Sequence, residues 1–163
     1  MLLSKRHGWS DSASLLAKTE RVSVLCDTSV LIAASDAEHQ HHARSLERVS
    51  MPRREEVFCA AHSLAEMYAA LTAMRTPRMR RVEDVLVTVE QVATRLKPVT
   101  LTAQEYIWVV RHVASIGARS GQVYDALILK CAEKCRARAV YTWNTDHFMR
   151  VAWPAVAPLI SVP

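Results

Sequence analysis

Short runs of β-branched and other apolar residues alternate along the chain with longer stretches in which apolar residues recur every three or four positions. The first pattern is typical of buried strands and the second of amphipathic helices, and their alternation predicts βαβ units around a parallel sheet. The predicted strands are Val22–Cys26, Val57–Ala60, Pro98–Leu101, Ala139–Trp143 and an edge strand at Leu159–Val162. The fold class that follows is α/β, a three-layer α/β/α sandwich with a central parallel sheet.

Helices are predicted in the segments between these strands. They are expected from about Thr28, at His42–Val49, at His62–Met74, between Val82 and Leu96, at Ala103–Ser115 and at Gln122–Cys135. Hydroxyl side chains stand where two of them begin. Thr28 and Ser29 are candidate caps of the first helix, and Thr102 is the candidate cap of the helix Ala103–Ser115.

The length of 163 residues indicates one domain, here expected over residues 22–163, preceded by a polar N-terminal extension at residues 1–21. Only three glycines occur, Gly8, Gly117 and Gly121, so the chain lacks the clustered glycines of a Walker loop or a dinucleotide-binding turn. The net charge of +5 gives a mild preference for polyanions. Any chemistry must therefore come from side chains.

The cysteines and the apolar windows bear on the compartment. Cys26, Cys59, Cys131 and Cys135 all lie in apolar stretches, which indicates buried free thiols in a reducing cytoplasm. The first 21 residues hold no uninterrupted apolar region of signal-peptide length. A cytoplasmic protein with no membrane span is expected.

Four acidic residues stand alone in apolar neighbourhoods: Asp27, Glu66, Asp125 and Asp146. An ionised carboxylate near a core costs several kcal/mol unless it is paired or holds a metal, so four such acids favour a common explanation. They are too far apart in sequence to pair locally, but Asp27 and Asp146 each follow a predicted strand, and the carboxyl ends of parallel strands share one rim. Carboxylate oxygens suit Mg²⁺ or Mn²⁺. A divalent cation is the predicted counterion.

Each acid also has a separate structural explanation. Asp125 suits the start of a helix through the macrodipole, and Asp27 suits a helix cap. Asp146 is placed to form an Asx turn with Asn144, and Glu66 to face solvent from its helix. The joint pattern favours the shared cation over four unrelated roles.

Taken together, four segments resemble a PIN-domain ribonuclease of the VapC toxin type. These are residues 24–32 (VLCDTSVLI), 63–68 (SLAEMY), 124–128 (YDALI) and 141–148 (YTWNTDHF). The resemblance covers about Val22 to Val162. It implies a parallel-sheet α/β/α domain whose clustered acids bind Mg²⁺ or Mn²⁺ and hydrolyse RNA phosphodiester bonds.

By the same resemblance, Asp27, Glu66 and Asp125 match the family's first three acids. Asn144 occupies one place where the family carries its fourth acid, so Asp146 is predicted to fill that role with Asn144 as its neighbour. The chemistry of such a centre makes Asp27 and Asp125 direct metal ligands. It leaves Glu66 and Asp146 to bond through water or to orient the nucleophile.

Three hydroxyls are expected near the same rim. Thr28, Ser29 and Thr142 are each placed to bond a carboxylate or a phosphate, although helix capping explains the first two equally well. With Asn144 they form the predicted surroundings of the acids.

Basic residues are clustered in sequence. The candidate RNA-binding group is Arg75, Arg78, Arg80 and Arg81, and a second cluster is Arg44, Arg48, Arg53 and Arg54. Solvated helix ends are the alternative explanation for either cluster.

One histidine cluster and one tryptophan near the acids also require an interpretation. His39, His41 and His42 favour a helix start over a metal site, because no Cys or acid completes a recognisable ligand set. Trp143 favours the core or a partner contact over base stacking, since no arginine is interleaved with it.

The leading functional prediction is a metal-dependent endoribonuclease that acts as the toxin of a type II toxin–antitoxin pair. The resemblance implies RNA as substrate, a small cognate antitoxin protein as inhibitor and a homodimer. The alternatives are a catalytically weak PIN-fold module that binds RNA or protein, and a housekeeping RNA-processing nuclease. A phosphotransfer protein with an acceptor aspartate is disfavoured, because Asp27 lacks both a D-x-D partner and an adjacent acid.

Overall fold

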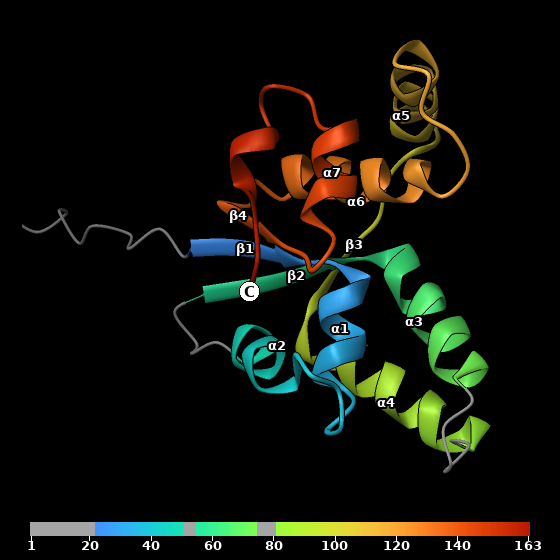
Figure 1. Cartoon of the computed structure of the whole chain (residues 1–163), viewed down its shortest axis with the longest axis vertical. Helices are drawn as coiled ribbons and strands as arrows, with labels where there is room; N and C mark the ends of the chain where they lie inside the picture. Colours follow the sequence, from blue (N-terminus) through green and yellow to red (C-terminus); the bar gives the residue numbers. More distant parts are fainter. Residues whose placement is uncertain (1–21, 51–54, 75–80) are drawn as a thin grey trace, which may run out of the picture.

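A five-stranded parallel sheet forms the centre of the molecule (Figure 1). The computed structural model describes residues 22–50, 55–74 and 81–163, so the predicted extension at 1–21 lies outside the described residues. The strand order is β3-β2-β1-β4-β5, and every neighbouring pair is parallel. The strands are β1 (Val22–Cys26), β2 (Glu55–Ala60), β3 (Lys97–Val99), β4 (Ala139–Tyr141) and β5 (Ile160–Ser161).

Helices cover both faces of this sheet, which confirms the predicted three-layer α/β/α sandwich. One face carries α1 (Thr28–Ala34), α2 (His42–Val49), α3 (Ala61–Ala73) and α4 (Val82–Arg95). The other carries α5 (Ala103–Ser115), α6 (Gln122–Lys134) and α7 (Thr145–Val151), followed by the 3₁₀ turn η1 (Ala157–Leu159). Figure 1 shows the first group below the sheet and the second group above it.

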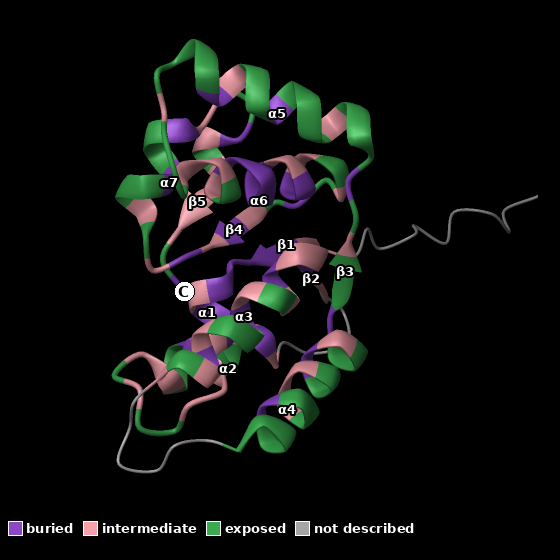
Figure 2. Ribbon diagram, turned by 90° about the vertical axis from the view of Figure 1, so that its right-hand side faces the viewer, coloured by how far each residue is buried: buried purple, intermediate pink, exposed green. Residues whose placement is uncertain are grey.

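The alternation of side chains along the strands produces two separate cores. In β1, Leu25 packs into the core beneath α5, α6 and α7, whereas the next residue, Cys26, packs into the core beneath α1 to α4. The same alternation occurs in β2, where Ala60 faces the first core and Cys59 the second. Figure 2 shows the buried positions on the sheet and on the inner sides of the helices. The central strands are therefore buried on both faces of the sheet, which explains their nearly continuous apolar runs.

The strand order creates a switch point between β1 and β4. After β1 the chain moves outward through β2 to β3, and it then crosses to the other side of β1 to form β4. In open parallel sheets, ligands bind beyond the carboxyl ends of the strands at such a switch. Asp27 directly follows β1, and Thr142 directly follows β4. The topology thus places both residues at the expected binding rim.

The helix starts agree only in part with the sequence. Thr102 caps α5 as predicted, in a capping box: its backbone N–H donates to Glu105 Oε2 (2.6 Å), and Glu105 N–H donates to Thr102 Oγ1 (3.3 Å). The prediction that Thr28 and Ser29 cap α1 is wrong, because both already lie in the helix and Asp27 holds the N-cap position. Their hydroxyls bond to acidic side chains instead.

Four strands and one helix differ from the predictions, and β5 differs only in being one residue shorter at each end than the predicted Leu159–Val162. β2 begins two residues earlier, at Glu55, and β4 ends at Tyr141 rather than Trp143. β3 spans Lys97–Val99 rather than Pro98–Leu101, and as an edge strand it tolerates the missing N–H of Pro98. The short helix α7 was not predicted, because it buries only Phe148 and Val151 and so gives little periodic signal.

Two further expectations concern cysteines and membranes. All four cysteines are free thiols, as predicted, and three of them are buried, but Cys135, at the C-cap of α6, is only partly buried. Within the described residues, no helix combines the length and apolar character needed to cross a membrane.

Candidate active site

Asp27 stands at the centre of the rim, almost completely buried at 4% exposure. Its backbone N–H donates to the carbonyl of Tyr141 (2.9 Å), which ties the end of β1 to the end of β4. Two hydroxyls donate to the same carboxylate oxygen, Oδ2: Ser29 Oγ at 2.6 Å and Thr142 Oγ1 at 2.8 Å. Burial raises the pKa of Asp27, and these hydrogen bonds partly oppose the rise.

Both hydroxyls are themselves oriented by the chain that leaves β4. The backbone N–H of Trp143 donates to Ser29 Oγ (3.1 Å), and that of Asn144 donates to Thr142 Oγ1 (3.0 Å). Because each hydroxyl oxygen accepts from a backbone N–H, its own proton is directed at Asp27. Two hydrogen-bond relays therefore fix the orientation of this carboxylate.

Glu66 projects from α3 and is bonded at one oxygen only. Its Oε2 accepts from Thr28 Oγ1 at 3.1 Å. Its Oε1 is buried and has no hydrogen-bond partner in the described part of the chain, although His62 Nε2 lies 3.7 Å away. Burial raises the pKa of Glu66, and the nearby charge of Asp27 raises it further. Since Oε1 is an unsatisfied acceptor, the site favours a cation or a proton donor there.

Asp125, in the first turn of α6, completes a group of three acids. Its pKa is raised from 3.8 to about 6, first by burial and then by the charges of Asp27 and Glu66. Among the described residues, the charge of His147 opposes this rise. The fold thus brings three acids from distant parts of the sequence close enough to disfavour one another's ionisation.

The fourth predicted acid has a different environment. Asp146 is exposed in the first turn of α7, and its charge is not among those that shift the pKa of the other three. Asn144 is exposed at the N-cap position of the same helix. The role of Asp146 in the site stays a prediction.

The donor set fits a hydrated divalent cation better than a fully enclosed one. Among residues 22–50, 55–74 and 81–163, no group of three or more His, Cys, Asp or Glu side chains is arranged to hold a metal ion. Mg²⁺, however, is usually held through one or two carboxylates and keeps several waters. Asp27 and Asp125 fit that requirement, and the unpartnered Oε1 of Glu66 fits a water in the cation's shell.

Comparisons with known proteins agree with this fold. The profile of the PIN domain matches residues 24–154. The chain belongs to the PIN domain family. No curated protein matches its sequence.

Two solved structures share the fold of this PIN domain. VapC20 of Mycobacterium tuberculosis, a sarcin-ricin loop cleaving toxin, has a TM-score of 0.56 at 21% identity, covering 76% of this chain and 92% of its own. A chain of VapBC2 from Rickettsia felis, bound to a DNA fragment of its promoter, has a TM-score of 0.61 at 17% identity, covering 86% and 98%. The structural neighbours of this PIN domain are VapC toxins of VapBC toxin–antitoxin systems.

The structure also adds two histidines to the PIN domain site. His62 was expected to begin its helix, and it does lie in the first turn of α3, but it also faces Glu66 one turn later. The i, i+4 spacing of His62 and Glu66 is the signal that could have revealed this contact. His147 acts on Asp125 from a helix that the sequence did not predict, so no local pattern indicated it.

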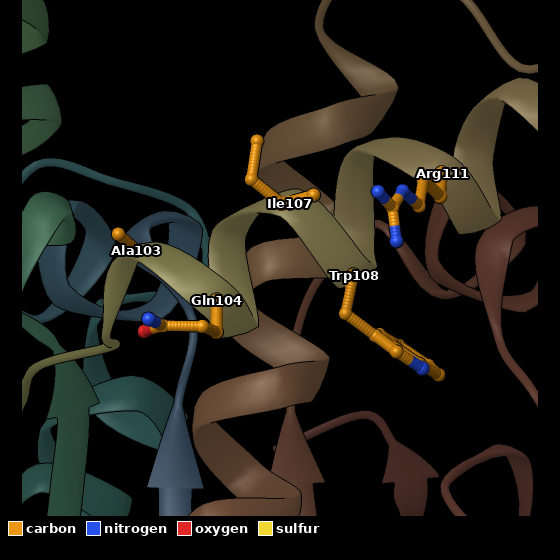
Figure 3. Close-up of a pocket in the computed structure, with 5 residues that line it drawn as sticks. All are labelled: Ala103, Gln104, Ile107, Trp108 and Arg111. Carbon is orange, nitrogen blue, oxygen red and sulfur yellow. The ribbon is translucent and has the colours of Figure 1, made fainter.

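One hollow on the surface of this PIN domain lies on α5, away from the three acids. It has a volume of about 410 Å³ and is lined by Ala103, Gln104, Ile107, Trp108 and Arg111, all on α5 (Figure 3). No acidic side chain lines it. The carboxylate rim, rather than this hollow, is therefore the candidate active site.

The relays around Asp27 give a first prediction. Thr142→Val keeps the side-chain shape, but it removes one donor from Asp27 and leaves the N–H of Asn144 without its acceptor. We expect the free energy of unfolding to fall by about 1–3 kcal/mol, measured by urea denaturation. Thr142→Ser retains the hydroxyl and is the matched control. Equal stability of the valine and serine variants would contradict the relay.

Proposed function

We propose that this PIN domain is a metal-dependent endoribonuclease and the toxin of a type II toxin–antitoxin pair. The observation that carries the proposal is the group of three mutually repelling carboxylates, Asp27, Glu66 and Asp125, at the switch point of the sheet. A site of this kind needs a cation, and cation-bound carboxylates are suited to phosphoryl chemistry. The likeness to VapC toxins supports RNA as the substrate.

Each residue of the candidate active site has its own proposed role. Asp27 and Asp125 would hold Mg²⁺ or Mn²⁺, while Ser29 and Thr142 keep Asp27 in its orientation. When bound, the cation supplies activation of water and neutralisation of charge on the phosphate. Glu66, with its free Oε1, is placed to accept a proton from the attacking water and to orient it. Asp146 is proposed to contribute through water from the edge of the site.

The proposed partners follow from the same likeness. A small antitoxin protein would inhibit the enzyme by presenting a basic side chain to the three acids, and the toxin would act as a homodimer. The alternatives are a housekeeping RNA-processing nuclease and a catalytically weak module that binds RNA or protein. Cleavage of RNA by the purified protein with Mn²⁺, lost on chelation, separates the enzyme from the binding module.

A short upstream reading frame would separate the toxin from the housekeeping nuclease. Such a frame should encode a DNA-binding protein that co-purifies with this chain and blocks its cleavage of RNA. Its absence would favour the housekeeping nuclease.

Of the four predicted RNA-binding arginines, one lies in the described part of the chain. Arg75, Arg78 and Arg80 lie outside the described residues. Arg81 is exposed before α4, with its Nε 3.5 Å from Glu83 Oε2. Phosphate binding by this group stays a proposal, for which a steep fall of RNA affinity with salt is the expected result.

The raised pKa of Asp125 predicts how stability depends on pH. The folded protein binds this proton more tightly than the unfolded chain, so without metal the stability falls as pH rises from about 4 to about 6. After allowance for the partial exposure of Asp125, its ionisation should lower the free energy of unfolding by about 1 kcal/mol, which corresponds to a few degrees in the melting temperature. A cation needs the ionised carboxylate, so Mn²⁺ should stabilise the protein increasingly over the same range.

Thermal melting at a series of pH values, in chelator and in Mn²⁺, measures both effects. Asp125→Asn should reduce both pH dependences, while Asp27 and Glu66, whose pKa values burial also raises, keep an effect of the same sign. A melting temperature in chelator that rises between pH 4 and 6 would contradict the raised pKa of Asp125.

A further inference from the structure

Two aromatic rings are stacked at the edge of the carboxylate rim. Trp143 directly follows Thr142, and its indole Nε1 donates to Oγ of the fully buried Ser45 on α2 (2.9 Å). The ring of His41 lies face to face on this indole, with 3.8 Å between centroids and 12° between planes. Trp143 is thereby held in place by two residues that are distant from it in sequence, Ser45 on α2 and His41 in the loop before α2.

A guanidinium lies beside the same stack. The Arg44 Cζ is 5.5 Å from the centroid of the Trp143 ring, and the side chain is exposed on α2. Within the described parts of the chain, no carboxylate forms an ion pair with Arg44. Arg48, one turn later, lies over Tyr141 at 5.0 Å. The charge of Arg44, which has no acidic partner among the described residues, is thus held next to the Trp143 ring after β4.

This group is directly connected to the candidate active site. The backbone N–H of Trp143 donates to Ser29 Oγ, which in turn donates to Asp27. Only two hydrogen bonds therefore separate the stack from the central carboxylate. The sequence disfavoured a stacking role for Trp143 because no arginine is adjacent in the chain, but the fold supplies Arg44 from α2.

We infer that His41, Arg44 and Trp143, here called the α2 ledge, bind a nucleotide of the RNA substrate next to the scissile phosphate. The inference rests on the proposed function and names a contact outside the three acids. Aromatic rings stack on unpaired bases with little regard to sequence, and guanidinium groups bind phosphate or stack on bases. The ledge offers both groups on one side of the acids. A single-stranded segment of RNA is the ligand with the matching chemistry.

The test measures RNA binding without cleavage. Asp27→Asn serves as the background, and the affinity of a fluorescent single-stranded RNA oligonucleotide is measured by anisotropy at several salt concentrations. The variants are Arg44→Gln, His41→Ala and His41→Phe. Arg111→Gln is the matched control, because it removes an exposed arginine from α5, which lies at the opposite end of the molecule from α2 (Figures 1 and 2).

The ledge predicts a different result for each variant. His41→Ala should weaken binding about fivefold or more with an unchanged salt slope, and His41→Phe should restore most of the affinity by keeping a ring. Arg44→Gln should weaken binding and also reduce the slope of log affinity against log salt by about 0.7, the value for one phosphate contact on a single strand. When Asp27 is retained so that the enzyme can cleave, His41→Ala and Arg44→Gln should each raise the KM for RNA and leave kcat nearly constant.

The failure of this inference differs from the failure of the proposed function. If Arg44→Gln and His41→Ala bind RNA as tightly as Arg111→Gln, the ledge is not a nucleotide site, even where Asp27→Asn has abolished cleavage. A fall in kcat without a change in affinity would also overturn it, because the stack would then act only on the geometry of Asp27. If the wild-type chain neither binds nor cleaves RNA, the proposed function itself fails, and the inference with it.

Discussion

Asp27→Asn removes RNA cleavage by more than about a hundredfold while leaving the fold intact. Even partners one step removed from a metal ordinarily cost 10–100-fold in activity or metal affinity, and Asp27 is a proposed direct ligand. Asn keeps the shape and still accepts hydrogen bonds from Ser29 and Thr142. Cleavage of a labelled RNA with Mn²⁺ measures the loss, and circular dichroism measures the fold.

The same substitution has a defined effect on stability. Because burial raises the pKa of Asp27, its ionised form is unfavourable in the folded protein at neutral pH. The neutral Asn should therefore melt, without metal, at the same temperature as the wild type or higher. Asp84→Asn, on the exposed start of α4, is the control for loss of one negative charge and should cleave normally. Full activity of Asp27→Asn would refute the assignment of this residue.

Phe148→Ala lowers the free energy of unfolding by about 3–5 kcal/mol, the usual cost of truncating a buried phenylalanine. Phe148 is completely buried in the core beneath α5, α6 and α7, and it is the largest fully buried side chain among the described residues. Because α7 is short and buries only Phe148 and Val151, Phe148 is the larger of the two side chains that anchor it. Denaturation with urea gives the free energy directly.

Met149 supplies the control for Phe148. It is the next residue of α7 and is 52% exposed, so Met149→Ala should change the free energy of unfolding by less than about 0.5 kcal/mol. Similar losses for the two variants would show that the helix, rather than the buried ring, determines the effect.

The sequence predicted the architecture because the dominant signals are local. Apolar runs in β1 and β2 identified buried strands, and Thr102 marked the start of α5. The position of Asp27 at the rim also followed from the end of the first strand alone, since parallel strands share a direction. Such features depend on neighbours in the chain, which a sequence displays.

The remaining features depend on contacts between distant segments. Thr28 and Ser29 resembled helix caps, but their hydroxyls bond to acidic side chains. Thr28 reaches Glu66 because α3 packs against α1, and Ser29 reaches Asp27 across the turn that follows β1. The stack of His41 on Trp143 joins residues about a hundred positions apart. Neither arrangement leaves a periodic trace in the sequence.

The proposed function requires that Asp27 and Asp125, with Glu66 acting through water, hold a divalent cation that this chain needs to cut RNA. The most direct measurement incubates the purified protein with a single-stranded RNA labelled at both ends, in Mn²⁺, in excess EDTA, and in EDTA followed by excess Mn²⁺. We expect internal cleavage of the RNA in Mn²⁺, no cleavage in EDTA, and recovery of cleavage when Mn²⁺ is restored. Intact RNA in Mn²⁺, or cleavage that persists in EDTA, would contradict it.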